Sequence, residues 1–169
     1  MRYEEDYAKC NPGWGAEDAP DKVREVLRAI SRANLRPTSA CDIGCGVGDV
    51  LAQLYRCLKL ECAVGSDISR HAIAQARQRE AEGLEFRLGD ATLDRESFDV
   101  MLILDVVEHV GGPVAFLRAI KHKAPIAILN PPAGAERAEG HEPDEPDARA
   151  AGVWPRQLLQ RASGAGSHG

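Results

Sequence analysis

A glycine-rich turn follows a short apolar segment in the stretch Ser39 to Leu51. Gly44, Gly46 and Gly48 stand between an acidic residue, Asp42, and a run with the apolar spacing of a helix. Residues without side chains let the backbone turn tightly from a strand into a helix and bring free N–H groups close to a ligand. The sequence therefore predicts a strand, a turn and a helix around the binding site of a nucleotide-like cofactor.

The spacing of these glycines differs from the dinucleotide fingerprint G-x-G-x-x-G. Counted from Gly44, the third glycine of that fingerprint would fall at position 49, which is Asp49. A carboxylate at the mouth of the turn repels a pyrophosphate, but it tolerates a cofactor that has no phosphate and carries a cationic centre. S-adenosylmethionine, a sulfonium that also carries an ammonium group, fits this description. A nicotinamide-dependent dehydrogenase is disfavoured.

Three further apolar segments lead into acidic residues. The first ends at Asp67, about 20 residues after Gly48, the distance expected for an acid that binds ribose hydroxyls at the end of a second strand. The next leads into Gly89-Asp90-Ala91, and the last ends at Asp105. Apolar runs that alternate with helix patterns are typical of a parallel sheet covered on both faces. The predicted fold is an α/β, Rossmann-like, doubly wound and mostly parallel sheet flanked by helices.

Four ordered segments carry a family resemblance: CDIGCGVG (41–48), VGSDIS (64–69), LGDA (88–91) and LDVVEHV (104–110). Together they resemble the class I S-adenosylmethionine-dependent methyltransferases, in particular small-molecule members with a D-x-x-E-H-V segment after the fourth strand. The resemblance covers about residues 1–132. It implies transfer of a methyl group from S-adenosylmethionine to an oxygen or nitrogen of a small-molecule acceptor, with S-adenosylhomocysteine as product.

The resemblance also implies which residues surround the cofactor. Asp42 would order the glycine turn near the amino-acid end of the cofactor, which the backbone from Gly44 to Gly46 approaches. Asp67 would accept both ribose hydroxyls through charge-assisted hydrogen bonds. Ile68 would pack on the adenine face. The predicted cofactor-binding set is Asp42, Gly44, Cys45, Gly46, Asp67, Ile68, Asp90, Ala91, Leu104 and Asp105.

Asp90 and Ala91 have a particular role in this prediction, at the edge of the adenine. The carboxylate of Asp90 and the backbone N–H of Ala91 would read that edge. Aspartate is also a frequent residue in turns and helix caps. A purely structural role for Asp90 therefore stays an alternative.

Glu108 and His109 are the predicted catalytic residues. Methyl transfer is an in-line displacement at the sulfonium carbon, so positioning supplies much of the acceleration and a base serves only to remove the acceptor's proton. Histidine titrates in the range that this task requires. The alternative is that both residues only cap or line the segment after the fourth strand.

A metal site is a further alternative for the same segment. Quinone-biosynthesis O-methyltransferases have a similar E-x-x-E-H segment that binds a divalent metal and holds a catechol oxygen. Here Asp105 replaces the first glutamate and shortens one arm of such a site. The prediction therefore includes no metal.

Composition bounds the partners and the location. The 169 residues suit one domain, and the net charge is −5 with Lys and Arg scattered along the chain, so no nucleic-acid-binding face is expected. No apolar run approaches the roughly 18–20 residues of a membrane span, and the start MRYEED does not resemble a signal peptide. We therefore expect a cytoplasmic protein with no membrane partner, whose five cysteines are reduced.

We divide the chain into three parts. Residues 1–17 carry three of the five Tyr and Trp residues and form an aromatic leader, which either folds over the cofactor or substrate as a lid or packs on the sheet edge. Residues 18–132 form the S-adenosylmethionine-binding domain. Residues 133–169 are expected to hold an acidic loop, a short amphipathic helix and a disordered tail.

The sequence departs from the family after the fifth predicted strand, Ala124 to Leu129. Methyltransferases of this class usually continue into two more strands, but nothing after Gly152 alternates like a strand. Strands six and seven are therefore expected to be missing. The fifth strand would then have an open edge, covered either by a second copy in a homodimer or by residues 133–160.

The same departure leaves a second hypothesis for function. The missing strands would remove part of the usual wall around the acceptor. A chain of this kind can keep its affinity for S-adenosylmethionine without catalysing transfer. The alternative to an active enzyme is therefore a catalytically impaired, methyltransferase-like S-adenosylmethionine-binding module.

Overall fold

The computed structural model describes residues 18–93, 95–129 and 152–155, the last as backbone only. Three 3₁₀ turns, η2 (Arg77–Arg79), η3 (Ala91–Leu93) and η4 (Val107–His109), lie between the larger elements. The predicted leader and most of the predicted C-terminal part lie outside the described residues. The helices and strands are α2 (Ala19–Arg32), β1 (Ser39–Ile43), α3 (Asp49–Leu58), β2 (Cys62–Asp67), α4 (Arg70–Ala76), β3 (Leu84–Leu88), β4 (Val100–Ile103), α5 (Pro113–Ile120), β5 (Ile126–Leu129) and β6 (Gly152–Pro155).

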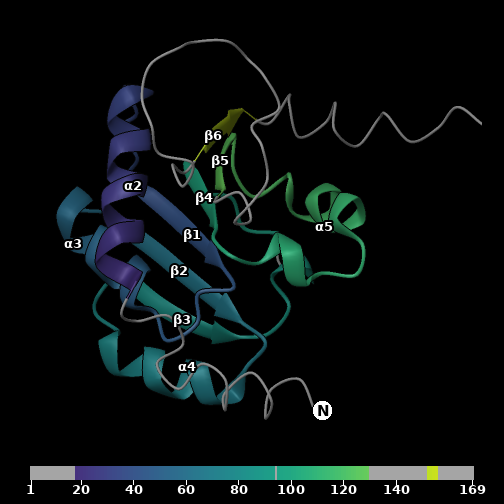
Figure 1. Ribbon diagram of the computed structural model, residues 1–169. Coiled ribbons are helices and arrows are strands. Elements are labelled where there is room, and N and C mark those ends of the chain that lie inside the picture. Colours follow the sequence, from purple (N-terminus) through teal and green to yellow (C-terminus); the bar gives the residue numbers. More distant parts are fainter. Residues whose placement is uncertain (1–17, 94, 130–151, 156–169) are drawn as a thin grey trace, which may run out of the picture.

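The strands form one sheet in the order β3-β2-β1-β4-β5-β6 (Figure 1). Strands β1 to β5 run parallel, and β6 runs antiparallel to β5. From β1 the chain passes to β2 and β3 on one side and later returns to β4 and β5 on the other. Such a reversal leaves a crevice at the carboxyl ends of the two central strands, where ligands bind in sheets of this kind. The predicted Rossmann-like fold is confirmed.

The sixth strand corrects the prediction that the sheet ends at β5. Leu129 lies opposite Gly152, and Ile126 lies opposite Pro155. The sequence pattern missed this strand because four residues bounded by glycine and proline are too few to show alternation. Val153 and Trp154 lie instead in the part of the chain, residues 133–169, for which the sequence predicts a short amphipathic helix. Pro155 is tolerated because β6 has no second neighbouring strand among the described residues.

Pairing of β5 with β6 removes the reason for which a homodimer was expected. That expectation rested on an open edge of β5, and the edge is closed by a segment of the same chain. The alternative, in which part of residues 133–160 covers the edge, is the one observed. No seventh strand is present among residues 18–129 and 152–155.

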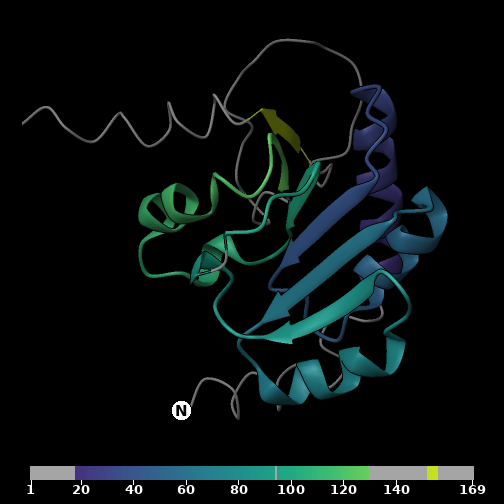
Figure 2. The same ribbon diagram turned by 180° about the vertical axis from the view of Figure 1, so that it is seen from behind.

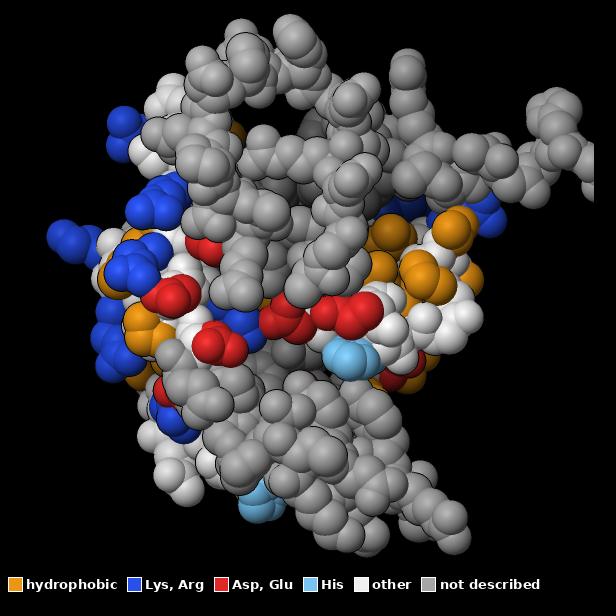
Figure 3. All heavy atoms as spheres, in the orientation of Figure 1, with side chains coloured by type: hydrophobic (Ala, Val, Ile, Leu, Met, Phe, Trp, Pro, Cys, Tyr) orange, Lys and Arg blue, Asp and Glu red, His pale blue; other side chains and the backbone are white. Residues whose placement is uncertain are grey.

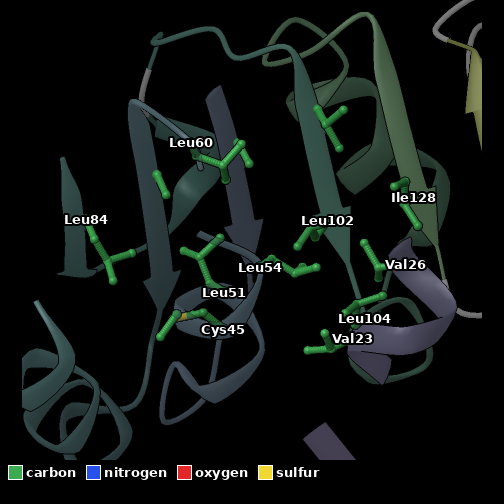
Figure 4. Close-up of a cluster of buried hydrophobic side chains, with 14 of the residues drawn as sticks. Val23, Val26, Cys45, Leu51, Leu54, Leu60, Leu84, Leu102, Leu104 and Ile128 are labelled. Atoms are coloured by element: carbon green, nitrogen blue, oxygen red, sulfur yellow. The ribbon is translucent and has the colours of Figure 1, made fainter. Parts of the chain in front are cut away.

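The core has two apolar layers, one on each face of the sheet. Along β4 and the residue after it, Leu102 and Leu104 pack with α2 and α3, whereas Met101 and Ile103 pack with α5. Full burial of an aliphatic side chain of this size contributes about 1.5–3 kcal/mol. Figure 4 shows the first layer, where Val23 and Val26 of α2 lie near Leu104 and Ile128, and Leu54 of α3 lies between Leu102 and Leu51.

The two faces carry different helices. Helix α2 crosses the face seen in Figure 1, whereas Figure 2 shows α5 beside β4 and β5 on the other face, with no α-helix across β1 to β3. Between β3 and β4 the described residues contain only the 3₁₀ turn η3. Helices α2 and α5 therefore approach the carboxyl end of β4 from opposite sides. No helix within the described ranges has the length and apolar character needed to cross a membrane.

The carboxylate of Asp99, which directly precedes β4, forms hydrogen bonds with the start of β1. Asp99 accepts hydrogen bonds from the backbone N–H of Thr38 at 2.8 Å and of Ser39 at 2.9 Å, and from the Thr38 hydroxyl at 3.0 Å. The Ser39 hydroxyl in turn accepts one from the Asp99 N–H at 3.0 Å. These bonds hold β1 and β4 in register, and the backbone and side-chain donors lower the pKa of Asp99.

Candidate functional site

A cavity of about 770 Å³ lies at the carboxyl ends of β1, β2 and β4. Its volume falls within the range of small-molecule sites, roughly 300–1,000 Å³. Its walls come from the glycine turn, the strand ends, the start of α2, the turns η3 and η4, and α5. All ten predicted cofactor-binding residues line it: Asp42, Gly44, Cys45, Gly46, Asp67, Ile68, Asp90, Ala91, Leu104 and Asp105.

The glycine turn is held between β2 and the segment after β4. The Gly44 N–H donates to the carbonyl oxygen of Ser66 at 2.8 Å. Gly44 has a φ of +76°, and a Cβ added to it would lie 2.3 Å from Cγ2 of Val106. A side chain at this position would therefore be both strained and blocked. The turn and the segment carrying the predicted catalytic residues are packed directly against each other.

Asp67 is oriented at the cavity by two backbone donors. Its Oδ2 accepts from the Gly46 N–H at 2.9 Å, and its Oδ1 accepts from the Ser69 N–H at 2.8 Å. Each carboxylate oxygen can accept a second hydrogen bond, so both remain suited to a vicinal diol. Ile68, the next residue, is 67% exposed although it is a large apolar residue, and it borders the cavity. An exposed apolar side chain beside an oriented carboxylate suits a ligand with a flat ring and a sugar.

Asp42 is buried at the end of β1. Burial and, to a smaller extent, the charge of Asp67 raise the pKa of Asp42 to about 7, although the charge of Lys22 opposes both. A buried carboxylate of this kind is costly when ionised and unpaired. A cationic group placed beside Asp42 would relieve that cost.

We expect the variant Asp42→Asn to stabilise the ligand-free protein, and to do so increasingly as pH rises. The folded state binds the Asp42 proton more tightly than the unfolded state, so between the ordinary pKa near 4 and the raised value near 7 wild-type stability falls as pH increases. The difference in the free energy of unfolding between variant and wild type should be near zero at pH 4 and reach at most about 4 kcal/mol above pH 7. Urea unfolding across this range measures it, and a gap that does not change with pH would contradict the burial argument.

Asp90 and Ala91 lie on the wall at the turn η3. Oδ1 of Asp90 accepts a hydrogen bond from the Thr92 N–H at 2.8 Å, so the turn-capping role considered for Asp90 is observed. The residue is nevertheless exposed on the cavity wall, and Ala91 beside it is buried. The cap fixes the carboxylate at the edge of the site.

Asp49 does not stand alone at the cavity mouth. Its Oδ1 accepts a hydrogen bond from Nε of Arg79 at 2.8 Å and forms an ion pair with Nη2 of the same side chain, also at 2.8 Å. The charge of Asp49, which was expected to repel a pyrophosphate, is compensated by this ion pair. The unfavourable field for phosphate comes instead from the remaining carboxylates of the wall.

The wall carries a strong excess of negative charge. Six aspartates line the cavity, and Lys22 is the single lysine or arginine among the described lining residues. Figure 3 shows acidic side chains, with a histidine beside them, across the middle of this face. The site therefore favours a ligand with cationic character.

Lys22 is a lining residue that the sequence reasoning missed. It comes from the first turns of α2, and its Nζ lies 2.7 Å from Oδ2 of Asp105. The sequence gives no local signal for this contact, because the two residues belong to separate elements. Val106, Val110 and Phe116, which line the side near η4, were missed for the same reason.

Only one of the two predicted catalytic residues lies on the cavity wall. His109 lines the cavity from η4, where its backbone N–H donates to the carbonyl oxygen of Val106 at 2.9 Å. Glu108 is exposed and is not among the lining residues. No group of three or more His, Cys, Asp or Glu side chains is arranged to hold a metal ion in the part of the chain that the structure describes.

Comparison with known proteins gives one family match. The sequence model of the family described as "Methyltransferase domain" matches residues 36–126, more than half of the chain. The ubiquinone biosynthesis O-methyltransferase of Ruegeria pomeroyi is 39% identical over 84 residues, which cover 46% of this chain and 33% of that protein. The norajmaline N-methyltransferase of Rauvolfia serpentina is 31% identical over 126 residues, covering 64% of this chain and 43% of that protein. The chain thus spans less than half the length of either relative.

Solved structures share the fold. The magnesium protoporphyrin IX methyltransferase of Synechocystis, crystallised with bound S-adenosylhomocysteine, has a TM-score of 0.56 and 24% identity over 65% of this chain and 54% of that chain. The plantazolicin methyltransferase BpumL, also with S-adenosylhomocysteine, has a TM-score of 0.62 and 21% identity over 73% of this chain and 52% of that chain.

Proposed function

This chain belongs to the methyltransferase domain family, and on that premise we propose that it binds S-adenosylmethionine and transfers its methyl group to an oxygen or nitrogen of a small-molecule acceptor. One observation carries the proposal: the cavity brings together all ten residues predicted for the cofactor, with an excess of carboxylates around them. A sulfonium with an ammonium group is a cation that such a wall stabilises. The names of the curated relatives, an O- and an N-methyltransferase, support the reaction class.

The cavity has a suitable place for each part of the cofactor. Asp67 is oriented to accept the ribose hydroxyls, and Ile68 offers an apolar surface to adenine. Asp42 would be stabilised in its charged form by a neighbouring ammonium. When bound, the cofactor supplies an electrophilic methyl group on its sulfur.

His109 would act as the base. It borders the cavity beside Val106, Val110 and Phe116, which form a largely apolar wall suited to a small organic acceptor. Its imidazole would take the proton that the acceptor hydroxyl or amine loses, while the wall holds the acceptor in line. Glu108 lies outside the lining and would not contact the reacting atoms.

A catalytically impaired binding module is the second candidate function. It is favoured by the position of Glu108, because one of the two predicted catalytic residues lies away from the cavity. Both candidates would bind S-adenosylmethionine, but only the enzyme would transfer its methyl group.

Incubation with methyl-labelled S-adenosylmethionine and a metabolite extract tests the proposal. The expected result is a labelled small molecule, formed together with S-adenosylhomocysteine. Calorimetry with S-adenosylhomocysteine alone should show one site per chain. Binding without any labelled product would favour the binding module, and absence of binding would overturn both functions.

A further inference from the structure

Val106 connects the glycine turn with the segment that carries His109. It follows β4, directly precedes η4, lines the cavity and packs, partly buried, against the apolar layer on the face of α5. Its carbonyl oxygen accepts a hydrogen bond from the His109 N–H at 2.9 Å. The backbone of this one residue is therefore bonded to the proposed base, whereas its side chain contacts the turn that the proposed cofactor approaches.

The contact between Val106 and the turn depends on the missing side chain of Gly44. A Cβ at residue 44 would overlap Cγ2 of Val106, so this methyl group occupies the place that a side chain of residue 44 would take. Gly44 is itself fixed, because its N–H donates to the carbonyl oxygen of Ser66 in β2 at 2.8 Å. The methyl group of Val106 therefore rests against backbone that the sheet holds in place.

The side-chain type and the local backbone both limit the movement of residue 106. Valine carries two methyl groups on Cβ, and this branching restricts χ1. Asp105, directly before it, has a φ of +55°, so the chain bends in a left-handed conformation between β4 and Val106. A stiff side chain after such a bend acts as a spacer. Its contact with the turn determines how near η4, and with it His109, lies to the turn.

We infer that Val106 is a positioning residue for methyl transfer, and that its Cγ2 sets the separation between the glycine turn and the imidazole of His109. This inference rests on the proposed function, because it requires a methyl donor at the turn and a base at His109. It gives Val106 a role beyond that of an apolar wall for the acceptor. A displacement of about 1 Å at a reacting group can lower a rate about 100-fold, so a spacer of one methyl group is large enough to matter.

The geometry of the contact suggests a pair of compensating substitutions. Val106→Ala removes the methyl groups and frees the segment to move relative to the turn. A Cβ at residue 44 would lie 3.6 Å from Cβ of Val106, an ordinary contact, so adding Gly44→Ala to Val106→Ala refills the empty place. Val106→Thr keeps the branched shape. Val107→Ala is the matched control, because Val107 is the adjacent, partly buried valine and is not among the cavity-lining residues.

Three measurements on the whole chain separate the possible roles. NMR of protein labelled at its histidines reports the imidazole of His109, whose signal is identified by its absence in His109→Gln. Calorimetry gives the affinity for S-adenosylhomocysteine. Methyl-labelled S-adenosylmethionine, at a saturating concentration with the metabolite extract, gives the rate of transfer. Urea unfolding establishes that each variant is folded.

In Val106→Ala, the His109 signal should shift or split and the rate of transfer should fall about 10- to 100-fold, while the affinity stays within about threefold of wild type. The compensated variant, Gly44→Ala with Val106→Ala, should show one His109 signal again and recover about tenfold of the lost rate. Val106→Thr should stay within about threefold of wild type in rate, and Val107→Ala should match wild type in all three measurements. If alanine at the left-handed residue 44 unfolds the compensated variant, Val106→Ala and Val106→Thr decide between them.

Four outcomes would overturn the inference and leave the proposed function standing. They are a rate in Val106→Ala equal to that of wild type, an equal loss in Val106→Thr, a loss of rate with an unaltered His109 signal, and a compensated variant that folds and binds but recovers neither signal nor rate. The third outcome would assign Val106 to the acceptor wall alone. If wild type binds S-adenosylhomocysteine without transfer, or does not bind it, the proposed enzyme fails and the inference with it.

Discussion

Replacement of Asp67 by alanine is expected to weaken binding of S-adenosylhomocysteine by roughly 30- to 1000-fold. The change removes two charge-assisted hydrogen bonds to the ribose, worth about 2–4 kcal/mol together. Calorimetry measures the effect directly. An unchanged dissociation constant would contradict the assignment of Asp67 to the ribose.

Asp67 also orders the turn, since it accepts from the N–H groups of Gly46 and Ser69, and this second role requires a control. A 5′-methylthioadenosine analogue without the two ribose hydroxyls supplies it. Wild type should prefer the hydroxylated ligand strongly, and Asp67→Ala should bind both alike. If the variant still prefers the hydroxylated ligand as wild type does, the carboxylate acts only on the turn.

Replacement of His109 by alanine should lower the turnover number by about 100-fold or more and leave the affinity for S-adenosylhomocysteine unchanged. The imidazole would act on the acceptor's proton, and removal of a general base has an effect of this size. Turnover with an identified acceptor, measured across pH, gives the comparison.

Glu108→Ala is the matched control, because Glu108 is adjacent in sequence but outside the cavity lining. We expect its turnover within about threefold of wild type. An unaltered turnover in His109→Ala would assign His109 a structural role in η4. A large loss in Glu108→Ala would restore the original prediction of two catalytic residues.

The sequence was most informative where a function depends on neighbouring residues. A strand, three glycines and a helix are local features, and so is an acidic residue at a strand end. The ten predicted residues between Asp42 and Asp105, all of which line the cavity, could therefore be identified from the sequence. The parallel topology followed from apolar runs that alternate with helices. Each of these signals lies within a few residues of the position that it predicts.

The features that could not be predicted join segments far apart in the chain. Lys22 of α2 pairs with Asp105 after β4, and Arg79 of the turn η2 compensates the charge of Asp49 in α3. Strand β6 has too few residues for a periodic signal. None of these partners has a pattern that distinguishes it from an ordinary surface residue. The sequence also could not show that His109 lines the cavity and Glu108 does not. Which of the two side chains faces the cavity depends on how the segment around η4 packs against the glycine turn.

The link between Asp99 and the start of β1 has a consequence for the order in which the chain is synthesised. Asp99 and Ser39 are 60 residues apart, and β4 completes the pairing of β1 on the side away from β2. While the nascent chain ends before β4, the future central strand is an edge strand, exposed to pairing with other chains. Asp42 and Asp67 already lie on the half-sheet β3-β2-β1 at that stage. The part of the cavity around Asp42 and Asp67 is therefore synthesised before the part that carries His109.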